Sequence, residues 1–443
     1  MKVLKITPIL AFCIVVTLGL TGCGGGSGGS GSPGAAASNN SGAATGGNSN
    51  PFIPPSQSSS GSTTSSSSGQ GSSGSVGNLG LVLIPSDAAD EDTTIANSPS
   101  IMQIVHIYDS NGNVLASPTM SSLSYAGIND FDGAALTPDG SEGVMMDGDD
   151  NNLYYFSVKN GEVSTAHTIS ANYGVDGDSV AILSSGDEAV ITLDNNGYLI
   201  LVSGILSGTP QTAASIPVPD YRDGLVSSND DKVLLARGAD GLTVFAINAI
   251  PPQPGQGGFA GTVSHTFTQT ANIVSLGTSK PDGASRDGMA ISPMDSSRAV
   301  VITNITNTTS SSTVDLLTGL PGNPVVSNSI SVSPVVDTVA ISPDGNLAIV
   351  GTDSGLLMFS GVASGALQQV GQLYAPSYTV NNGSVTLGKI TTLGFTVDGK
   401  YVVVCDYTNS ALLVIPVSTS GFGTPAGILP GISAPWSDNM MVH

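Results

Sequence analysis

One short motif occurs six times in this chain of 443 residues, and its spacing restricts the possible folds more than any other feature. In each copy an apolar run ends in a turn rich in Pro, Asp, Gly and Ser. The copies are Ala135–Gly140, Ile182–Gly186, Val226–Asp230, Ile291–Asp295, Ile341–Gly345 and Phe395–Gly399. Most lie 44 to 54 residues apart, and a Pro/Gly-rich insertion near Pro251 lengthens the third interval. A repeat of this length predicts a β-sheet unit that buries its faces by stacking on its neighbours.

Apolar runs and turns alternate within each repeat at the spacing of an all-β fold. In the first repeat the predicted strands are Ala134–Leu136, Gly143–Met146, Leu153–Val158 and Glu162–Ile169. Four antiparallel strands in roughly 40–45 residues form one blade of a β-propeller. The second and third strands of later repeats are almost continuously apolar, as expected where neighbouring blades cover both faces of a sheet.

The six motifs predict six complete blades, and the two ends of the region predict a seventh. Leu81–Ile84, Ile101–Ile107 and Val114–Ser117 supply its second, third and outer strands, and Ser437–Val442 supplies the inner strand. Pairing of these segments would close the ring and remove its free sheet edges. The alternative is a six-bladed ring with both ends appended.

The run formed by Ile341–Gly345, Leu347–Val350 and Leu356–Phe359 resembles the YVTN-type and lactonase-like seven-bladed β-propellers of bacteria. Residues 135–158 and 395–415 are similar. The resemblance covers nearly all of residues 79–443 and implies a seven-bladed propeller of four-stranded antiparallel blades. This architecture serves enzymes, scaffolds and ligand-binding proteins alike, and no catalytic residue of the family is carried over to a position of this chain.

The first 22 residues are a predicted targeting segment. Lys2 and Lys5 precede the apolar stretch Ile9–Leu20, which is short for a membrane span. Leu20–Cys23 resembles the bacterial lipobox, which implies a lipoprotein signal peptide in residues 1–22 and lipidation of Cys23 with acyl chains such as palmitate. The alternative is an ordinary secretory signal with a chance cysteine.

Residues 23–78 comprise Cys23 and a Gly/Ser-rich tether, and residues 79–443 are the predicted propeller domain. The tether is expected to be disordered, because it has too few apolar residues to offset the entropy of ordering. Several acyl chains on one cysteine attach a protein stably to a membrane. Gly24 stands where the family's inner-membrane retention signal has Asp, which favours the outer membrane of the cell envelope.

The chain is strongly acidic, with 33 Asp and Glu against 11 Lys and Arg and a formal net charge of −22. Such a charge repels phosphate backbones, so nucleic acid is excluded as a partner. Protein, glycan or cationic ligands fit better, and we expect a monomer. The only cysteine beyond the tether, Cys405, lies in an apolar run and is expected to be buried.

An aspartate recurs just before the predicted inner strand in six of the seven blades, and Thr391 takes its place in the last complete blade. The six are Asp132, Asp178, Asp223, Asp287, Asp337 and Asp438. Six carboxylates around the mouth of the central channel would attract a hard cation such as calcium. The alternative is structural: each carboxylate accepts N–H groups of the adjacent turn.

Other polar features carry weaker predictions. Asp147–Asn152 resembles a calcium loop but equally fits an Asx-rich turn. Arg222 and Arg286 precede two of the aspartates and are expected to form ion pairs. Three insertions are expected on the channel-mouth face, where long loops tend to bind ligands: 87–92, 251–285 and 374–388. The four histidines are dispersed, without metal-ligand spacing.

These features predict an envelope-anchored, non-catalytic propeller lipoprotein that binds a protein, a glycan or a cation at the channel mouth. The alternative function is a lactonase-like hydrolase that uses an Asp and a bound divalent ion. No cofactor other than calcium is expected.

Overall fold

The computed structural model describes the strands and turns of residues 80–443 with gaps. The described ranges are 80–86, 101–124, 131–137, 139–147, 152–164, 167–170, 177–193, 197–206, 211–219, 224–238, 240–250, 265–276, 288–304, 312–432 and 440–443. The chain divides into two units, Met1–Gly69 and Gln70–His443, and every described residue lies in the second. The predicted signal peptide, Cys23 and the whole tether lie outside the described residues.

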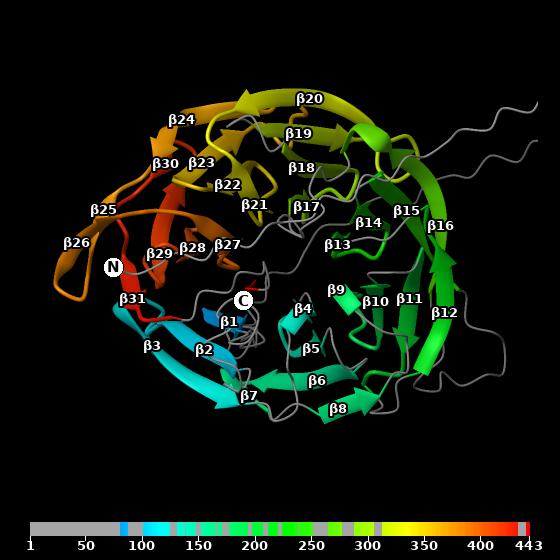
Figure 1. Ribbon diagram of the computed structural model, residues 1–443, viewed down its shortest axis with the longest axis horizontal. Helices are drawn as coiled ribbons and strands as arrows, with labels where there is room; N and C mark the ends of the chain where they lie inside the picture. Colours follow the sequence, from blue (N-terminus) through cyan, green and yellow to red (C-terminus); the bar gives the residue numbers. More distant parts are fainter. Residues whose placement is uncertain are drawn as a thin grey trace, which may run out of the picture. The chain divides into compact units, whose positions relative to one another are not determined.

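Seven antiparallel sheets are arranged as the blades of a β-propeller, with the inner strands nearest the axis (Figure 1). We number the blades in chain order. Blade 1 contains β1 (Leu81–Ser86), β2 (Ile101–Tyr108), β3 (Val114–Ser124) and β32 (Met441–Val442). Blade 2 contains β4 (Phe131–Leu136), β5 (Glu142–Asp147), β6 (Asn152–Lys159), β7 (Glu162–Val163) and β8 (His167–Ser170). Blade 3 contains β9 (Gly177–Ile182), β10 (Glu188–Leu193), β11 (Tyr198–Ser203) and β12 (Gln211–Pro217).

The remaining blades repeat this order. Blade 4 contains β13 (Gly224–Ser227), β14 (Val233–Gly238), β15 (Gly241–Ala249) and β16 (His265–Ile273). Blade 5 contains β17 (Met289–Ile291), β18 (Arg298–Asn304), β19 (Ser312–Thr318) and β20 (Val325–Val332). Blade 6 contains β21 (Val336–Ile341), β22 (Leu347–Thr352), β23 (Gly355–Ser360) and β24 (Gln368–Tyr374). Blade 7 contains β27 (Ile390–Phe395), β28 (Tyr401–Asp406), β29 (Ala411–Ser418), β30 (Gly421–Phe422) and β31 (Gly427–Pro430).

The predicted closure of the ring is confirmed. Strand β1 pairs with β2 on one side and with β32 on the other, where Val82 opposes Val442 and Leu83 opposes Met441. The His443 carbonyl accepts the N–H groups of Gly80 at 2.6 Å and Leu81 at 3.0 Å. The six-bladed alternative is therefore wrong. The outer strand of blade 1 is longer than predicted and continues from Ser117 to Ser124.

A separate apolar cluster fills each of the seven interfaces between neighbouring blades. Blade 1, for example, buries Leu83 against Met145 of blade 2, and Val82 against Val403 of blade 7. Cys405 is fully buried in the latter cluster, as predicted. The second and third strands are apolar on both faces because each face packs on a different neighbour.

The repeated motif forms the turn between inner and second strand, and its hydroxyl and carboxylate explain its composition. In blade 6 Ser342 Oγ donates to Asp344 Oδ1 at 2.5 Å and accepts the Leu347 N–H at 2.9 Å. Gly345 N–H donates to the Ser342 carbonyl at 2.8 Å, and its φ of +71° favours glycine. The same hydroxyl–carboxylate contact recurs at Thr137–Asp139, Ser228–Asp230 and Thr396–Asp398.

Because of these turns, the stability of the fold is expected to decrease at acid pH. Hydrogen bonds from Thr137, Ser297 and Ser342 lower the pKa values of Asp139, Asp295 and Asp344, respectively, below the ordinary value of 3.8. A carboxyl with a lowered folded-state pKa stabilises the fold above its unfolded pKa, and this stability is lost as pH falls through the folded value.

We therefore expect the melting temperature to fall as the pH is lowered from about 5 to about 3, measured by circular dichroism. The triple variant Asp139→Asn, Asp295→Asn and Asp344→Asn should lose less stability over the same interval. Equal acid slopes for the two proteins would contradict this assignment.

The insertion at residues 374–388 folds as a hairpin of β25 (Ser377–Val380) and β26 (Gly383–Thr386). Its anchor is Tyr378, whose hydroxyl donates to Asp406 Oδ2 at 2.7 Å. Asp406 is fully buried and also accepts from Gly388 N at 3.0 Å and Asn409 Nδ2 at 2.8 Å. A buried carboxylate thus fixes the hairpin to blade 7. Among the described residues no helix is long and apolar enough to cross a bilayer.

Candidate functional site

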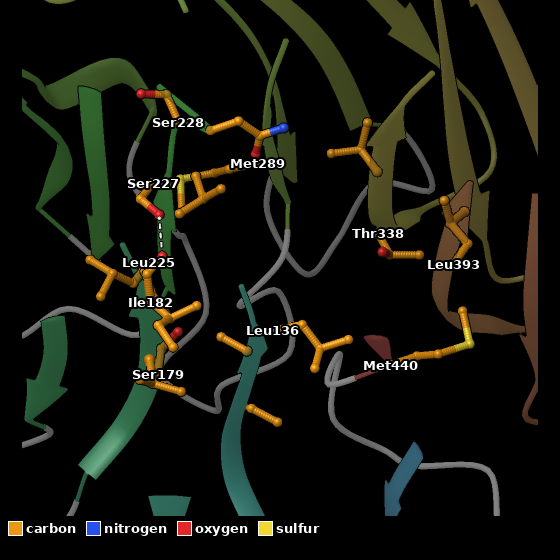
Figure 2. Close-up of a pocket in the computed structure, with 17 residues that line it drawn as sticks. Leu136, Ser179, Ile182, Leu225, Ser227, Ser228, Met289, Thr338, Leu393 and Met440 are labelled. Carbon is orange, nitrogen blue, oxygen red and sulfur yellow. Dashed lines mark hydrogen bonds between the residues drawn. The ribbon is translucent and has the colours of Figure 1, made fainter. Parts of the chain in front are cut away.

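A cavity of about 270 Å³ lies where the inner strands converge on the axis (Figure 2). Its lining comes from β4, β9, β13, β17, β21 and β27, with Met440 beside the closing strand. The apolar part includes Leu136, Ile182, Leu225 and Leu393. Small-molecule sites commonly have volumes of about 300–1,000 Å³, so this cavity lies just below that range and would take only a small ligand.

Hydroxyl groups and the Asn229 side chain supply the polar part of the lining. Ser227 Oγ donates to the Ile182 carbonyl of the neighbouring blade at 3.2 Å, and Ser228 Oγ donates to Asp230 Oδ1 at 2.8 Å. The Ser227 hydroxyl oxygen retains acceptor capacity for a ligand, whereas Ser228 Oγ already accepts the N–H groups of Lys232 and Val233 at 3.0 Å each. Thr338 enters from the opposite side, and no charged side chain is among the described residues that line the cavity.

The recurring aspartate occupies a defined position, a β-bulge on the inner strand. The pairing registers shift between Phe131 and Gly133 in blade 2 and between Val336 and Thr338 in blade 6, so Asp132 and Asp337 are the extra residues. A shift between Ile191 and Leu193 of β10 places Asp178 at the equivalent bulge of β9. Thr391 occupies the same position in blade 7. Bulges change the direction of a side chain at the rim of a β-structure.

The predicted metal set remains a prediction. Only Asp337 has a described side chain, which is 8% exposed. Asp223, Asp287 and Asp438 lie outside the described residues, as do Arg222 and Arg286. No three His, Cys, Asp or Glu side chains gather as a metal site in the part of the chain that the structure describes.

The glycine after two of these aspartates is explained by packing between blades. A Cβ atom built on Gly288 would lie 2.5 Å from a guanidinium nitrogen of Arg237, which is 1% exposed. A Cβ atom on Gly133 would lie 3.0 Å from the backbone nitrogen of Val180. Arg237 Nε donates to the Leu276 carbonyl at 3.0 Å, so this buried cation belongs to the interface between blades 4 and 5.

The other predicted sites have mixed outcomes. Asp109 Oδ1 accepts the N–H groups of Asn111 at 2.9 Å and Asn113 at 2.8 Å, which forms a tight turn between β2 and β3. Most of the Asp147–Asn152 turn, the 87–92 insertion and most of 251–285 lie outside the described residues.

Sequence reasoning missed one buried polar pair. His265 Nδ1 lies 2.5 Å from Glu188 Oε2, and the Glu188 side chain is only 1% exposed. The two residues are 77 positions apart and belong to blades 4 and 3. Only the ring arrangement brings them together, so no local pattern could have indicated the contact.

Comparison of the chain with known proteins gives structural likeness alone. No protein-family model matches it, and no curated protein matches its sequence. A functionally unknown protein from Desulfotomaculum acetoxidans is 17% identical, with a TM-score of 0.57 over 82% of this chain and 98% of that chain. A periplasmic gluconolactonase from Pseudomonas aeruginosa is 15% identical, with a TM-score of 0.55 over 82% and 99%. A putative 6-phosphogluconolactonase from Bacteroides fragilis is 16% identical, with a TM-score of 0.51 over 80% and 98%. These likenesses support the propeller fold.

Proposed function

We propose that the chain is an envelope-anchored, non-catalytic β-propeller that binds its ligand at the mouth and axis of the ring. Of the protein, glycan and cation classes expected from the sequence, a glycan fits the axial cavity best. The observation that carries this proposal is the cavity of about 270 Å³ with its mixed lining of carbon and hydroxyl groups. Apolar surface suits the face of a sugar ring, and Ser and Thr hydroxyls suit its hydroxyl groups. Attachment through Cys23 remains part of the proposal.

Filling the cavity should abolish ligand binding. Ala135 lines the cavity, so Ala135→Phe places a ring in the space a ligand would occupy. We expect calorimetry with a panel of neutral mono- and disaccharides to reveal at least one ligand of the wild-type protein. Ala135→Phe should lower the affinity for that ligand by a factor of about 100 or more.

The matched control is Ala214→Phe on the exposed outer strand β12, which should bind like the wild type. Saturable binding of calcium, magnesium or manganese without any sugar would favour the cation instead. Sugar binding that Ala135→Phe leaves unchanged would contradict the axial site.

A lactonase-like hydrolase is the second candidate, favoured by the likeness to a periplasmic gluconolactonase and to putative 6-phosphogluconolactonases. In this reading a mouth carboxylate such as Asp337 helps to hold a divalent ion beside the lactone carbonyl. Turnover of glucono-δ-lactone that requires a divalent ion and is lost in Asp132→Asn and Asp337→Asn would establish it. Absence of turnover with each ion would leave the binding function.

A further inference from the structure

Exposed apolar residues lie on adjoining turns of the face opposite the channel mouth, where inner strands turn into second strands. Met294 in the turn of blade 5 is 71% exposed and Val397 in the turn of blade 7 is 48% exposed. The turn of blade 6 joins them. A Cβ atom on Gly345 would lie 3.3 Å from Met294 Cβ, and one on Gly399 would lie 3.4 Å from Pro343 Cδ. Met294, Pro343 and Val397 thus lie on three successive turns that adjoin one another.

An aspartate follows each of these three residues, and we call the pairs 294–295, 343–344 and 397–398 the turn arc. Asp295 accepts from Arg298 Nε at 2.9 Å, and Asp398 lies 3.0 Å from Lys400 Nζ. The Lys400 side chain is 72% exposed, so it can leave when another cation arrives. Asp344 accepts only from neutral donors among the described contacts, Ser342 Oγ and both nitrogens of Asn346.

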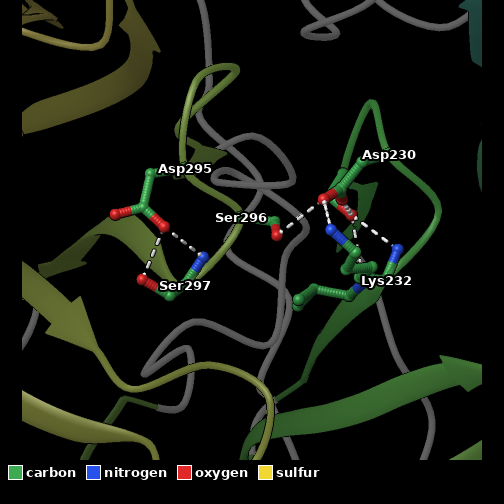
Figure 3. A network of polar contacts seen from close by, with 7 residues as sticks. Asp230, Lys232, Asp295, Ser296 and Ser297 are labelled. Atoms are coloured by element: carbon green, nitrogen blue, oxygen red, sulfur yellow. Dashed lines mark hydrogen bonds and ion pairs between the residues drawn. The ribbon is translucent and has the colours of Figure 1, made fainter. Parts of the chain in front are cut away.

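Contacts between neighbouring turns hold this face in place. Figure 3 shows Ser296 of blade 5 reaching towards Asp230 of blade 4, with Oγ and Oδ2 3.0 Å apart. Asp230 also binds Lys232 Nζ at 2.7 Å, and Asp295 accepts the Ser297 hydroxyl at 2.6 Å. Asp231 accepts the Ser184 N–H of blade 3 at 2.9 Å. The carboxylates of the turn arc are held within their own turns, by the hydroxyls of Ser297, Ser342 and Thr396. They are therefore oriented before any partner binds, which reduces the entropy that binding must overcome.

We propose that the turn arc docks an extended segment of a partner protein in which apolar residues alternate with Lys or Arg. An apolar–acidic alternation on the surface is complementary to an apolar–basic alternation in the ligand. The net charge of −22 disfavours a second copy of this chain, an anionic lipid surface and nucleic acid. Contiguous exposed apolar residues with a polar rim are typical of protein interaction sites.

The test uses the full chain and a fluorescent peptide of alternating Lys and Leu, followed by polarisation. Met294→Ser with Val397→Ser leaves the net charge unchanged and should weaken binding about tenfold, because it removes the apolar contacts. Asp344→Asn should weaken it about threefold. Met120→Ser on β3 removes another exposed apolar side chain, 43% exposed, and should have no effect.

A matched peptide of alternating Lys and Ser should bind at least about tenfold more weakly than the Lys/Leu peptide. Equal binding of the two peptides would show that the interaction is only a general attraction between charges, and this result would overturn the proposal. The proposal would also fail if the double Ser variant bound like the wild type, or if vesicles of anionic lipid bound the turn arc in its place.

Discussion

Removal of residues 440–443 is expected to abolish the folded propeller at ordinary temperature. Met440 and Met441 are 9% and 7% exposed, and burial of such a side chain stabilises a fold by about 1.5–3 kcal/mol. The truncation also removes three hydrogen bonds between His443 and Gly80 or Leu81, worth about 1 kcal/mol each. A loss of roughly 6–9 kcal/mol is comparable to the whole stability of a typical domain, about 5–15 kcal/mol.

The measurement is thermal unfolding followed by circular dichroism, together with the solubility of the shortened protein. A synthetic peptide of residues 436–443, added in trans, should restore stability in a saturable manner, because it binds the folded ring only. A scrambled peptide serves as the control. A shortened protein that melts like the parent would show that β32 does not seal the ring.

The second large effect is expected for Asp406→Ala. The substitution removes a fully buried carboxylate and leaves Tyr378 Oη and Gly388 N without this acceptor, while Asn409 Nδ2 keeps only the Thr386 carbonyl. Loss of one partner from a buried charged network costs about 3–5 kcal/mol, because each remaining group stays desolvated. At roughly 2.1 cal/mol/K per residue of unfolding entropy, a propeller of this size should melt about 5 °C lower.

Asp398→Ala is the matched control. Asp398 is also a carboxylate with several protein donors, namely Thr396 Oγ1, Lys400 N and Lys400 Nζ, but its side chain is 40% exposed. This control substitution should lower the free energy of unfolding by about 1 kcal/mol. Tyr378→Phe should fall between the two, since it removes one donor and leaves the others paired. Proteolysis within the β25–β26 hairpin gives a second readout, and equal cleavage of wild type and Asp406→Ala would contradict the anchoring role.

The strands that could be predicted from the sequence are those buried on both faces. Fully apolar runs such as Leu347–Val350 and Leu356–Phe359 predict middle strands, and β22 and β23 occupy these residues. The β25–β26 hairpin was expected only as a loop, because its two strands are four residues long each and carry few apolar residues. Its anchor lies 28 positions away at Asp406 and only the fold brings it close.

The candidate site was predictable only in part. The recurrence of an Asp before six of the seven inner strands was visible, but the bulge that carries Asp337 depends on the register with β22 and has no local signature. The cavity lining was not foreseen, since Ala135, Ser227 and Thr338 are ordinary strand residues until six inner strands place them around one axis. The contacts between successive turns likewise depend on the ring.

Seven separately filled interfaces give the chain an unusual freedom to diversify. A change in one blade disturbs two neighbouring clusters and leaves the other five as they are. The turns of blades 3 and 4 lack the Asp-Gly pair found in blades 2, 6 and 7, and blade 4 carries the long insertion near Pro251, yet both blades have four strands. New recognition loops can therefore be acquired blade by blade, each modular change being insulated from the rest of the scaffold.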